Sequence, residues 1–344
     1  FQISSATRAE DDVFLDGDPT GQLRKHGVRL VNDGSMICSL ANSREPAMNA
    51  EEILARPPRI LDRDQREHYF RNGYVGVPGL IGNDWLDPLC ELTARYVQAS
   101  REVTSSNATF DLEPDHTPDS PRLRRLNSPV DRDELFWRFA SESPIVDVVE
   151  DLLGPSFKFH HSKLNFKWSG GGEEVKWHQD IQFWPHTNYD VLTIGVYLED
   201  VDASMAPMGV VPCSHDGPLF DQYDDADRWV GHLREEDLPQ IDIESAGYVT
   251  GPAGTVTVHH CRAIHGSAPN LSDRMRPLLL IAYSAADALP VTNLTRHSGR
   301  GEAIVRGEPA RWVRFDPRPC LLPPDWSKQG GSRSIFAYQQ EEEE

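Results

Sequence analysis

The chain has 344 residues, which is enough for one large β-rich domain with extensions or for two small domains. Hydrophobic residues make up 38% of it, enough for a sizeable core, whereas a formal net charge of −20 disfavours a nucleic acid or an anionic membrane surface as partner. A cationic or zwitterionic small molecule would suit this acidic field. The sequence contains no stretch near the roughly 20 apolar residues of a membrane span, and no pattern that specifies an oligomeric state.

The cysteines predict a reducing compartment. Five of them are scattered along the chain without a Cys-x-x-Cys pair, and an odd number with wide spacing is typical of reduced thiols. No signal-peptide pattern opens the sequence, which begins at Phe1 rather than Met, so we expect the numbering to start inside a longer chain. We therefore expect a cytoplasmic protein.

Residues 1–60 are predicted to form an irregular extension, because they are polar and acidic and are punctuated by Gly and Asp. The alternation at 28–31 is compatible with one edge strand. A helix is predicted to begin after Asp62 and to end at Gly73, since Asp is a favourable N-cap and Gly a favourable residue after the last turn.

The next segments alternate between regular and irregular structure. A strand is predicted at 75–80, and a second helix begins at a cap formed by Asn83 or Asp84 and runs to about residue 97. Residues 102–132 form a polar, proline-rich connection, which we interpret as a solvated loop in preference to a lid that closes over a substrate. Two short helices are predicted after this connection, at 133–141 and 144–153.

From residue 157 onward the pattern is mostly that of strands. The predicted strands span 157–168, 174–184, 191–201, 255–259 and 276–284, and an acidic, loop-rich insertion occupies 216–245. Many strands with Gly/Pro turns, and helices mostly in the first half, predict a mainly β protein: a double-stranded β-helix (jelly-roll, cupin-like) flanked by helices. We expect this domain to span 61–290, with a polar C-terminal extension and acidic tail at 291–344.

A candidate metal site lies in the strand predicted at 174–184. His178 and Asp180 are two residues apart, so a strand places both on one face and turns Gln179 away. A third ligand must come from elsewhere, and His265 is the best candidate, with His259 and His260 as its rivals. Two His and one carboxylate on one side of a metal form the facial triad of non-haem Fe(II) oxygenases.

A buried arginine strengthens the hypothesis of an oxygenase. Arg276 lies eleven residues beyond His265 and opens an apolar run long enough for a buried strand. A buried guanidinium needs an anionic partner, and its fork suits a carboxylate. A metal that works with a dicarboxylate cosubstrate would explain both features, and that cosubstrate would be 2-oxoglutarate. Arg274 is the competing candidate for this position.

Several segments together resemble the phytanoyl-CoA dioxygenase family, whose members include ectoine hydroxylase. The matching segments are 70–80, 163–167, 177–185, 210–215 and 265–276, within a resemblance that covers roughly 62–285. Their order and spacing make the resemblance specific. Two departures are Cys213, where the family has Gly in a turn, and residues 204–208, which lack the family's Asn-Gly pair.

The resemblance implies a role for individual residues. It makes His178, Asp180 and His265 the Fe(II) ligands, and places Arg276 and Ser267 at the distal carboxylate of 2-oxoglutarate. The residues it implies around the remaining parts of the site are Asn165 at the metal-side carboxylate, and His161 and Trp184 near the substrate. Lys163 is a further candidate substrate residue, because it shares a strand face with Asn165 and faces either the pocket or solvent. Asn165 and Ser267 could instead satisfy backbone groups, and Trp184 could be core filler.

The function implied by the resemblance is hydroxylation of an unactivated C–H bond of a small molecule, with O2 consumed and succinate and CO2 released. We expect an amino acid, an amine or a natural-product intermediate as substrate. Asp180 favours hydroxylation over halogenation, because halogenation would need a small residue there, whereas desaturation or ring formation stay open. The alternatives are a Zn-type cupin-fold metalloenzyme and a non-catalytic jelly-roll that binds a ligand.

Overall fold

A computed structural model describes residues 48–170, 174–292, 298–325 and 334–340. The chain divides into two units, Phe1–Ser43 and Arg44–Glu344, and everything described lies in the second. The strand predicted at 28–31 therefore falls outside the described residues. In the part that is described, no helix combines the length and the apolar character that crossing a membrane requires.

Five of the six α-helices of the described chain lie in its first half, as predicted. They are α1 (Ala50–Leu54), α2 (Arg63–Asn72), α3 (Asn83–Ala99), α4 (Glu134–Glu142), α5 (Ile145–Leu153) and α6 (Ile335–Gln340). The strands are β1 (Tyr74–Val77), β2 (Phe110–Leu112), β3 (Leu123–Asn127), β4 (Phe157–Lys167), β5 (Val175–His178), β6 (Val191–Tyr197), β7 (Gly209–Val210), β8 (Gly247–Tyr248), β9 (Val256–His260), β10 (His265–Ser267), β11 (Arg276–Ala285) and β12 (Ile304–Arg306).

The two ends of α2 follow the sequence prediction. Asp62 accepts a hydrogen bond from the backbone of Gln65 at 2.8 Å, and the Gln65 side chain accepts one from the backbone of Asp62 at 3.0 Å. Gly73 ends the helix in the left-handed conformation, with φ 79°. For α3 the prediction was one residue late, because Gly82 is the N-cap and it provides no side-chain hydrogen bond.

Replacing Asp62 by Ala is expected to destabilise the protein by about 1 kcal/mol, because the Asp62 side chain that accepts from the Gln65 backbone at the start of α2 is lost. Urea unfolding followed by circular dichroism measures the change. Asp64→Ala is the control, since Asp64 is an exposed residue of the same first turn with no cap role. Equal losses in the two variants would show that the cap contributes nothing.

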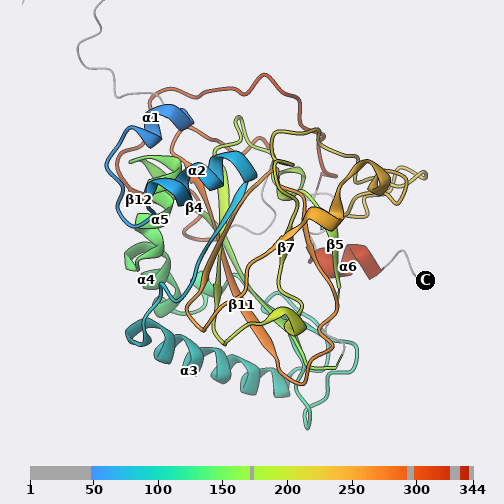
Figure 1. The fold of residues 1–344 in the computed structure, drawn as a ribbon. Helices are drawn as coiled ribbons and strands as arrows, with labels where there is room; N and C mark the ends of the chain where they lie inside the picture. Colours follow the sequence, from blue (N-terminus) through green and yellow to red (C-terminus); the bar gives the residue numbers. More distant parts are fainter. Residues whose placement is uncertain (1–47, 171–173, 293–297, 326–333, 341–344) are drawn as a thin grey trace, which may run out of the picture. The chain divides into compact units, whose positions relative to one another are not determined.

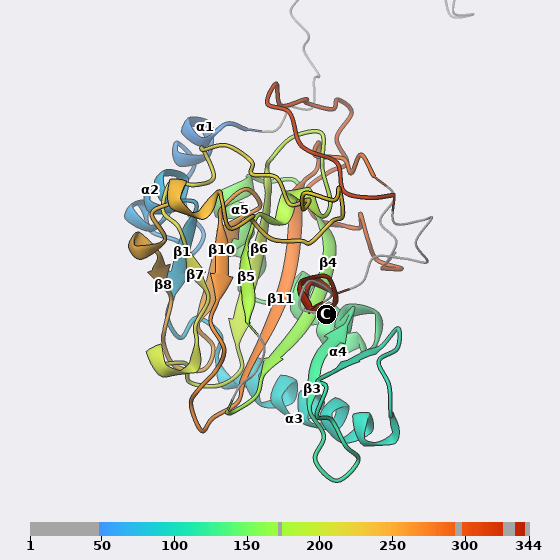
Figure 2. The ribbon, with the colours of Figure 1, turned by 90° about the vertical axis from the view of Figure 1, so that its right-hand side faces the viewer.

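The strands form two antiparallel sheets, which confirms the predicted double-stranded β-helix. The larger sheet has the order β1-β9-β6-β11-β4-β3-β2, with β12 also paired to β4, and the smaller has the order β5-β10-β7-β8. Figure 1 shows α4 and α5 on one side of β4 and β11, with β5 and β7 on the other. Figure 2 shows β5, β7 and β10 of the smaller sheet side by side. The larger sheet therefore has a helix-covered face and an inner face.

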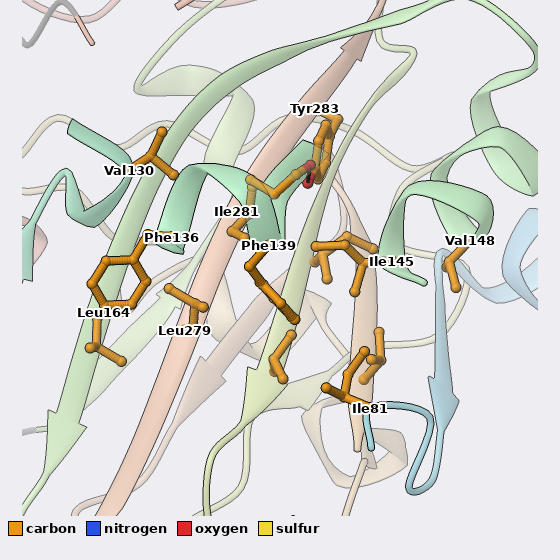
Figure 3. Close-up of a cluster of buried hydrophobic side chains, with 14 of the residues drawn as sticks. Ile81, Val130, Phe136, Phe139, Ile145, Val148, Leu164, Leu279, Ile281 and Tyr283 are labelled. Atoms are coloured by element: carbon orange, nitrogen blue, oxygen red, sulfur yellow. Dashed lines mark hydrogen bonds between the residues drawn. The ribbon is translucent and has the colours of Figure 1, made fainter. Parts of the chain in front are cut away.

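The helix-covered face of the larger sheet carries the main hydrophobic core. Leu279 and Ile281 of β11 pack there with Phe136 and Phe139 of α4 (Figure 3), and all four are completely buried. Residues of this set alternate along each strand with residues of the inner face. The inner face is left for polar side chains, and the site is built there.

A β-bulge in β4 interrupts this alternation. Ala282 of β11 pairs with His161, and the next residue, Tyr283, pairs with Phe159, so His160 has no partner across the ladder. The extra residue keeps Phe159 on the helix-covered face and lets both His160 and His161 contact Trp184, with ring centroids 5.1 and 5.7 Å from the Trp184 ring.

The connection predicted as a solvated loop at 102–132 instead contains a hairpin. β2 and β3 pair with one another, and β3 extends the larger sheet through its register with β4. The prediction was wrong because Arg124 and Arg125 look like surface residues in sequence but are only 5% and 7% exposed. Arg124 forms an ion pair with the equally buried Asp111 at 2.8 Å, and this partner makes burial possible.

The turn that contains Cys213 has a left-handed backbone, the conformation that Gly adopts most readily. Cys213 has φ 62°, its backbone N–H donates to the carbonyl of Asn72 at 3.1 Å, and its side chain is exposed. The left-handed conformation costs a residue with a Cβ about 1–2 kcal/mol. The substitution therefore leaves the turn in place at a cost in stability.

Candidate metal centre

Two of the three candidate ligands come from adjacent strands of the smaller sheet, and the third follows closely after one of these strands. His178 is the last residue of β5, His265 is the first residue of β10, and the two residues pair directly across the antiparallel ladder. The predicted strand at 174–184 is shorter than expected: it ends at His178, and Asp180 opens a 3₁₀-helix at Asp180–Gln182. Gln179 between them keeps an extended backbone, with φ −124° and ψ 119°, so the alternation that brings His178 and Asp180 together is retained.

The ligand atoms form a small buried triangle. Asp180 Oδ1 lies 3.7 Å from His178 Nε2 and 3.9 Å from His265 Nε2, and one ligand atom from each residue lies within 4.8 Å of the others. Metal bonds of about 2.0–2.2 Å require only a modest contraction of this triangle. In the described ranges, it is the one cluster of three His, Cys, Asp or Glu with this geometry. The donor set therefore fits a divalent metal such as Fe(II).

Hydrogen bonds fix the orientation of both imidazoles. His178 Nδ1 donates to the carbonyl of Lys176 at 2.9 Å, and His265 Nδ1 donates to the carbonyl of Ala263 at 2.9 Å. Each ring then has a proton on Nδ1 and a lone pair on Nε2, which is the arrangement that a metal ligand needs. Burial holds the pKa of His265 well below its usual value, which also favours the neutral, metal-binding form.

Asp180 is held through the oxygen that faces away from the two histidines. Its Oδ2 accepts from Thr193 Oγ1 at 3.2 Å and from His259 Nε2 at 3.3 Å, which leaves Oδ1 for a metal. Burial alone would raise the pKa of this carboxyl, but the Lys163 ammonium and the hydrogen bonds keep it well below its usual value. His259, a rival of His265 in the sequence, thus acts as a hydrogen-bond donor to Asp180. His260, the other rival, contacts Cys261 and the backbone of Arg262.

A buried glutamine network anchors the segment between the ligands. Gln179 donates to the carbonyls of Arg262 and Pro218 at 2.8 and 3.1 Å and accepts from the backbone of Phe220 at 3.0 Å. Gln222 donates to the carbonyl of Gln179 at 3.1 Å. These bonds tie the ligand-bearing segment to the acidic insertion and were not predicted from the sequence.

Gln179→Ala is expected to weaken metal binding by about tenfold, although it changes none of the three ligand residues. The reason is that loss of these supporting hydrogen bonds leaves the ligand side chains less precisely positioned. Fluorescence-monitored titration of the metal-free protein with Co(II) or Fe(II) measures the affinity. Gln240→Ala, at an exposed position of the same insertion, is the control and should bind normally. Unchanged affinity in Gln179→Ala would show that the network only stabilises the fold.

Arg276 lies at the start of β11 and is 3% exposed. Its Nη1 donates to the carbonyl of Ala206, its Nε has no hydrogen-bond partner, and no carboxylate of the described residues pairs with it. Burial lowers the pKa of this guanidinium. Arg274, the rival in the sequence, is exposed and pairs with Asp202. A buried guanidinium without an anionic partner is a place for an anion.

One pocket joins these features. Its lining contains His178 and His265 together with Lys163, Asn165, Ser267 and Arg276, so six of the predicted site residues meet there. The lining also contains His259, the rival of His265 in the sequence. The other pocket-lining residues were not predicted and are Arg125, Val175, Met208, Gly266, Leu278, Leu280 and Ile335. Asn165 accepts a hydrogen bond from Arg125 Nε at 2.8 Å, so its amide is oriented by β3.

Two predicted substrate residues lie outside this lining. His161 Nδ1 is 2.6 Å from His160 Nδ1, and burial lowers the pKa of His161 to about 3. Trp184 is 6% exposed and packs with Ile181 and Tyr189 in a separate hydrophobic cluster, while its ring also contacts both histidines. Trp184 is therefore part of a hydrophobic cluster and is not among the residues that line the pocket.

Comparison with known proteins is consistent with this geometry. The model of the family described as Phytanoyl-CoA dioxygenase (PhyH) matches residues 69–278. A probable alpha-ketoglutarate-dependent hypophosphite dioxygenase of Stutzerimonas stutzeri is 31% identical over 269 residues, covering 78% of this chain and 94% of the relative. The L-proline trans-4-hydroxylase of Streptomyces griseoviridis is 29% identical over 272 residues, covering 74% and 96%.

Solved structures support the fold. The crystal structure of EctD from S. alaskensis with bound Fe has a TM-score of 0.57 at 23% identity, covering 76% of this chain and 89% of that one. The structure of the same protein with 2-oxoglutarate and 5-hydroxyectoine has a TM-score of 0.55 at 21% identity, covering 79% and 91%. The family match covers more than half of the chain, and the hypophosphite dioxygenase relative is similar over most of its length. The chain therefore belongs to the phytanoyl-CoA dioxygenase family of iron- and 2-oxoglutarate-dependent dioxygenases.

Proposed function

We propose that this enzyme hydroxylates an unactivated C–H bond of a small molecule, with Fe(II), 2-oxoglutarate and O2, and releases succinate and CO2. The observation that carries the proposal is one pocket that joins the two histidines of a buried His/Asp/His triangle to a buried arginine, which no carboxylate of the described residues pairs with. A metal alone would explain the triangle. A dicarboxylate that reaches from the metal to Arg276 explains both.

Each residue of the pocket has a role in this proposal. His178, Asp180 and His265 would hold Fe(II), which when bound supplies the reaction with dioxygen and leaves open positions for the cosubstrate. Arg276 binds the distal carboxylate of 2-oxoglutarate, assisted by Ser267.

The rest of the lining orients the cosubstrate and excludes water. Asn165, oriented by Arg125, donates to the metal-side carboxylate of 2-oxoglutarate. Leu278, Leu280 and Ile335 are apolar parts of the same lining and keep water from the reacting centre.

For the substrate we propose a chemical class and no single compound. The relatives are named for hypophosphite, L-proline and ectoine, all of them small molecules, and we propose an amino acid, an amine or a natural-product intermediate for this chain. The carboxylate of Asp180 occupies the position at which a halogenase would need a small residue, which supports hydroxylation. Desaturation and ring formation are the alternative outcomes of the same chemistry.

Anaerobic titration of the metal-free protein with Fe(II) and 2-oxoglutarate tests the function. We expect a weak visible charge-transfer band that requires both components, followed in air by succinate release that suitable small metabolites stimulate. A zinc hydrolase or isomerase on this fold would instead be active with Zn²⁺ and without dioxygen, and a ligand-binding jelly-roll would turn over no 2-oxoglutarate. Either result would overturn the proposal.

We also propose a cytoplasmic location. Cys90, Cys213, Cys261 and Cys320, which are the cysteines of the described residues, are all free. Free thiols persist in a reducing compartment. Fractionation of cells that produce the protein, followed by immunoblotting, tests the location, and recovery outside the cytoplasm would contradict it.

A further inference from the structure

The charges of the pocket are opposite in sign to those of the whole chain. The chain has a net charge of −20, but the charged residues that line the pocket are Arg125, Lys163 and Arg276, with no Asp or Glu among the lining residues. The nearby carboxylate of Asp180 belongs to the metal centre. Buried or half-buried charges are screened far less than surface charges, so these cations dominate the local potential.

A comparison of the three lysines of β4 shows which of them is free to bind an anionic ligand. Lys158 forms an ion pair with Glu302, and Lys167 Nζ donates to the carbonyls of Ser267 and Ala268. Lys163, on the same inner face, forms neither a hydrogen bond nor an ion pair with any described residue. Its nearest charges are Asp180, which attracts it, and Arg125, which repels it, and burial lowers its pKa. An ammonium held in this way is suited to a second anion.

The sheet register separates Lys163 from the cosubstrate's distal carboxylate. Arg276 pairs with Lys167 across the β11–β4 ladder, whereas Leu280, four residues further along β11, pairs with Lys163. Four residues of strand span about 13 Å. Asn165 lies between these levels, opposite Leu278. A dicarboxylate that reaches toward Arg276 therefore extends away from Lys163.

We propose that the substrate carries a compact oxyanion, either a carboxylate or a phosphorus oxyacid, and that Lys163 binds it, with Arg125 adding to the attraction. This inference rests on the proposed function and narrows its substrate class. A substrate whose only charge is a protonated amine would be repelled by Lys163 and Arg125. The only negative charge near it would be that of the carboxylate metal ligand, so simple amines are excluded. Amino acids remain suitable through their carboxylate.

The test compares the enzyme with three variants: Lys163→Met, which keeps the stem and removes the charge, Lys163→Arg, which restores a charge, and Lys158→Met, a control on the same face of β4. Isothermal titration calorimetry is done anaerobically with Fe(II) and 2-oxoglutarate present. The probes are hypophosphite, L-proline and pyrrolidine, which is proline without its carboxylate. Hypophosphite and L-proline, which both carry an oxyanion, separate a phosphorus oxyacid from a carboxylate, and pyrrolidine reports binding through the amine.

We expect at least one of hypophosphite and L-proline to bind, Lys163→Met to weaken that binding by about tenfold or more, and Lys163→Arg and Lys158→Met to retain it. Pyrrolidine should not bind. The proposal is overturned if neither hypophosphite nor L-proline binds, if Lys163→Met binds them unchanged, or if pyrrolidine binds as well as proline.

Two further measurements keep this inference separate from the proposed function. The affinity for 2-oxoglutarate should change less than about threefold in Lys163→Met, and a tenfold loss would assign Lys163 to the cosubstrate and overturn the inference. If the visible band with Fe(II) and 2-oxoglutarate never forms, the proposed function fails. The anion titrations on the metal-free protein then still decide whether Lys163 forms an anion site.

Discussion

Asp180→Ala is expected to abolish substrate-stimulated succinate release, with a loss of at least about a thousandfold, and to prevent formation of the visible band with Fe(II) and 2-oxoglutarate. The reason is geometric: Oδ1 of Asp180 lies within 3.9 Å of Nε2 in both His178 and His265, and no other carboxylate in the described ranges completes that triangle. Two imidazoles alone hold Fe(II) poorly.

The controls for Asp180→Ala separate metal binding from folding. Removing the carboxylate also leaves His259 Nε2 without its acceptor and Lys163 without its nearest negative charge, so thermal unfolding must be measured alongside activity. Thr193→Val removes only the hydrogen bond to Oδ2, and we expect a loss of about tenfold. Asp202→Ala, at an exposed site, should be fully active. Normal turnover by folded Asp180→Ala would refute the ligand assignment.

Arg276→Gln is expected to raise the KM for 2-oxoglutarate by about 100-fold, because a charge-assisted contact to the distal carboxylate is replaced by a weaker neutral one. Metal binding should persist, since Arg276 is not one of the three candidate ligands. Steady-state kinetics with varied 2-oxoglutarate, together with metal titration, measures both effects. The same substitution removes a buried charge, so the variant is not expected to be less stable.

Arg274 provides a matched control for Arg276. It lies two residues earlier on the same segment, but its guanidinium is exposed and pairs with Asp202. Arg274→Gln should leave the KM for 2-oxoglutarate unchanged. Arg276→Lys should recover only part of the affinity, because an ammonium lacks the planar fork of a guanidinium. Equal effects of the Arg274 and Arg276 substitutions would mean that the cosubstrate binds elsewhere.

Two of the three residues that meet at the metal centre could be predicted because their positions follow from local spacing, whereas the choice of His265 over its rivals rested on the family resemblance. His178 and Asp180 share a face through the two-residue period of extended backbone, and this holds even though β5 ends at His178. The apolar run after Arg276 likewise identified β11, which is buried along its whole length. Strong periodicity of this kind needs no knowledge of distant contacts.

The residues that could not be predicted depend on partners far away in the sequence. Arg125 looks like part of a polar loop, and only the pairing of β3 with β4 brings it to Asn165. Ile335 belongs to a segment that reads as a polar extension, yet α6 lies beside β5 and contributes this side chain to the pocket. Neither position has a local pattern that distinguishes it from a solvated residue.

The net charge of the chain was a poor guide to the pocket. It suits a cationic ligand as well as a zwitterionic one, whereas the pocket lining carries the cations Arg125, Lys163 and Arg276, which a purely cationic ligand would not match. Exposed charges more than about 8–10 Å away are largely screened at physiological salt, so the few groups inside the pocket decide what binds there. Composition describes the surface of this protein and not its site.

The bulge at His160 affects how β4 is compared with the same strand of any relative. After the bulge, the residues that face the pocket have odd numbers, such as Lys163 and Asn165. Before it, the even-numbered Lys158 faces inward and the odd-numbered Phe159 faces the helices. An alignment that slides by one position across this point would exchange inward-facing for outward-facing side chains upstream. Substrate residues on this strand must therefore be matched separately on each side of His160.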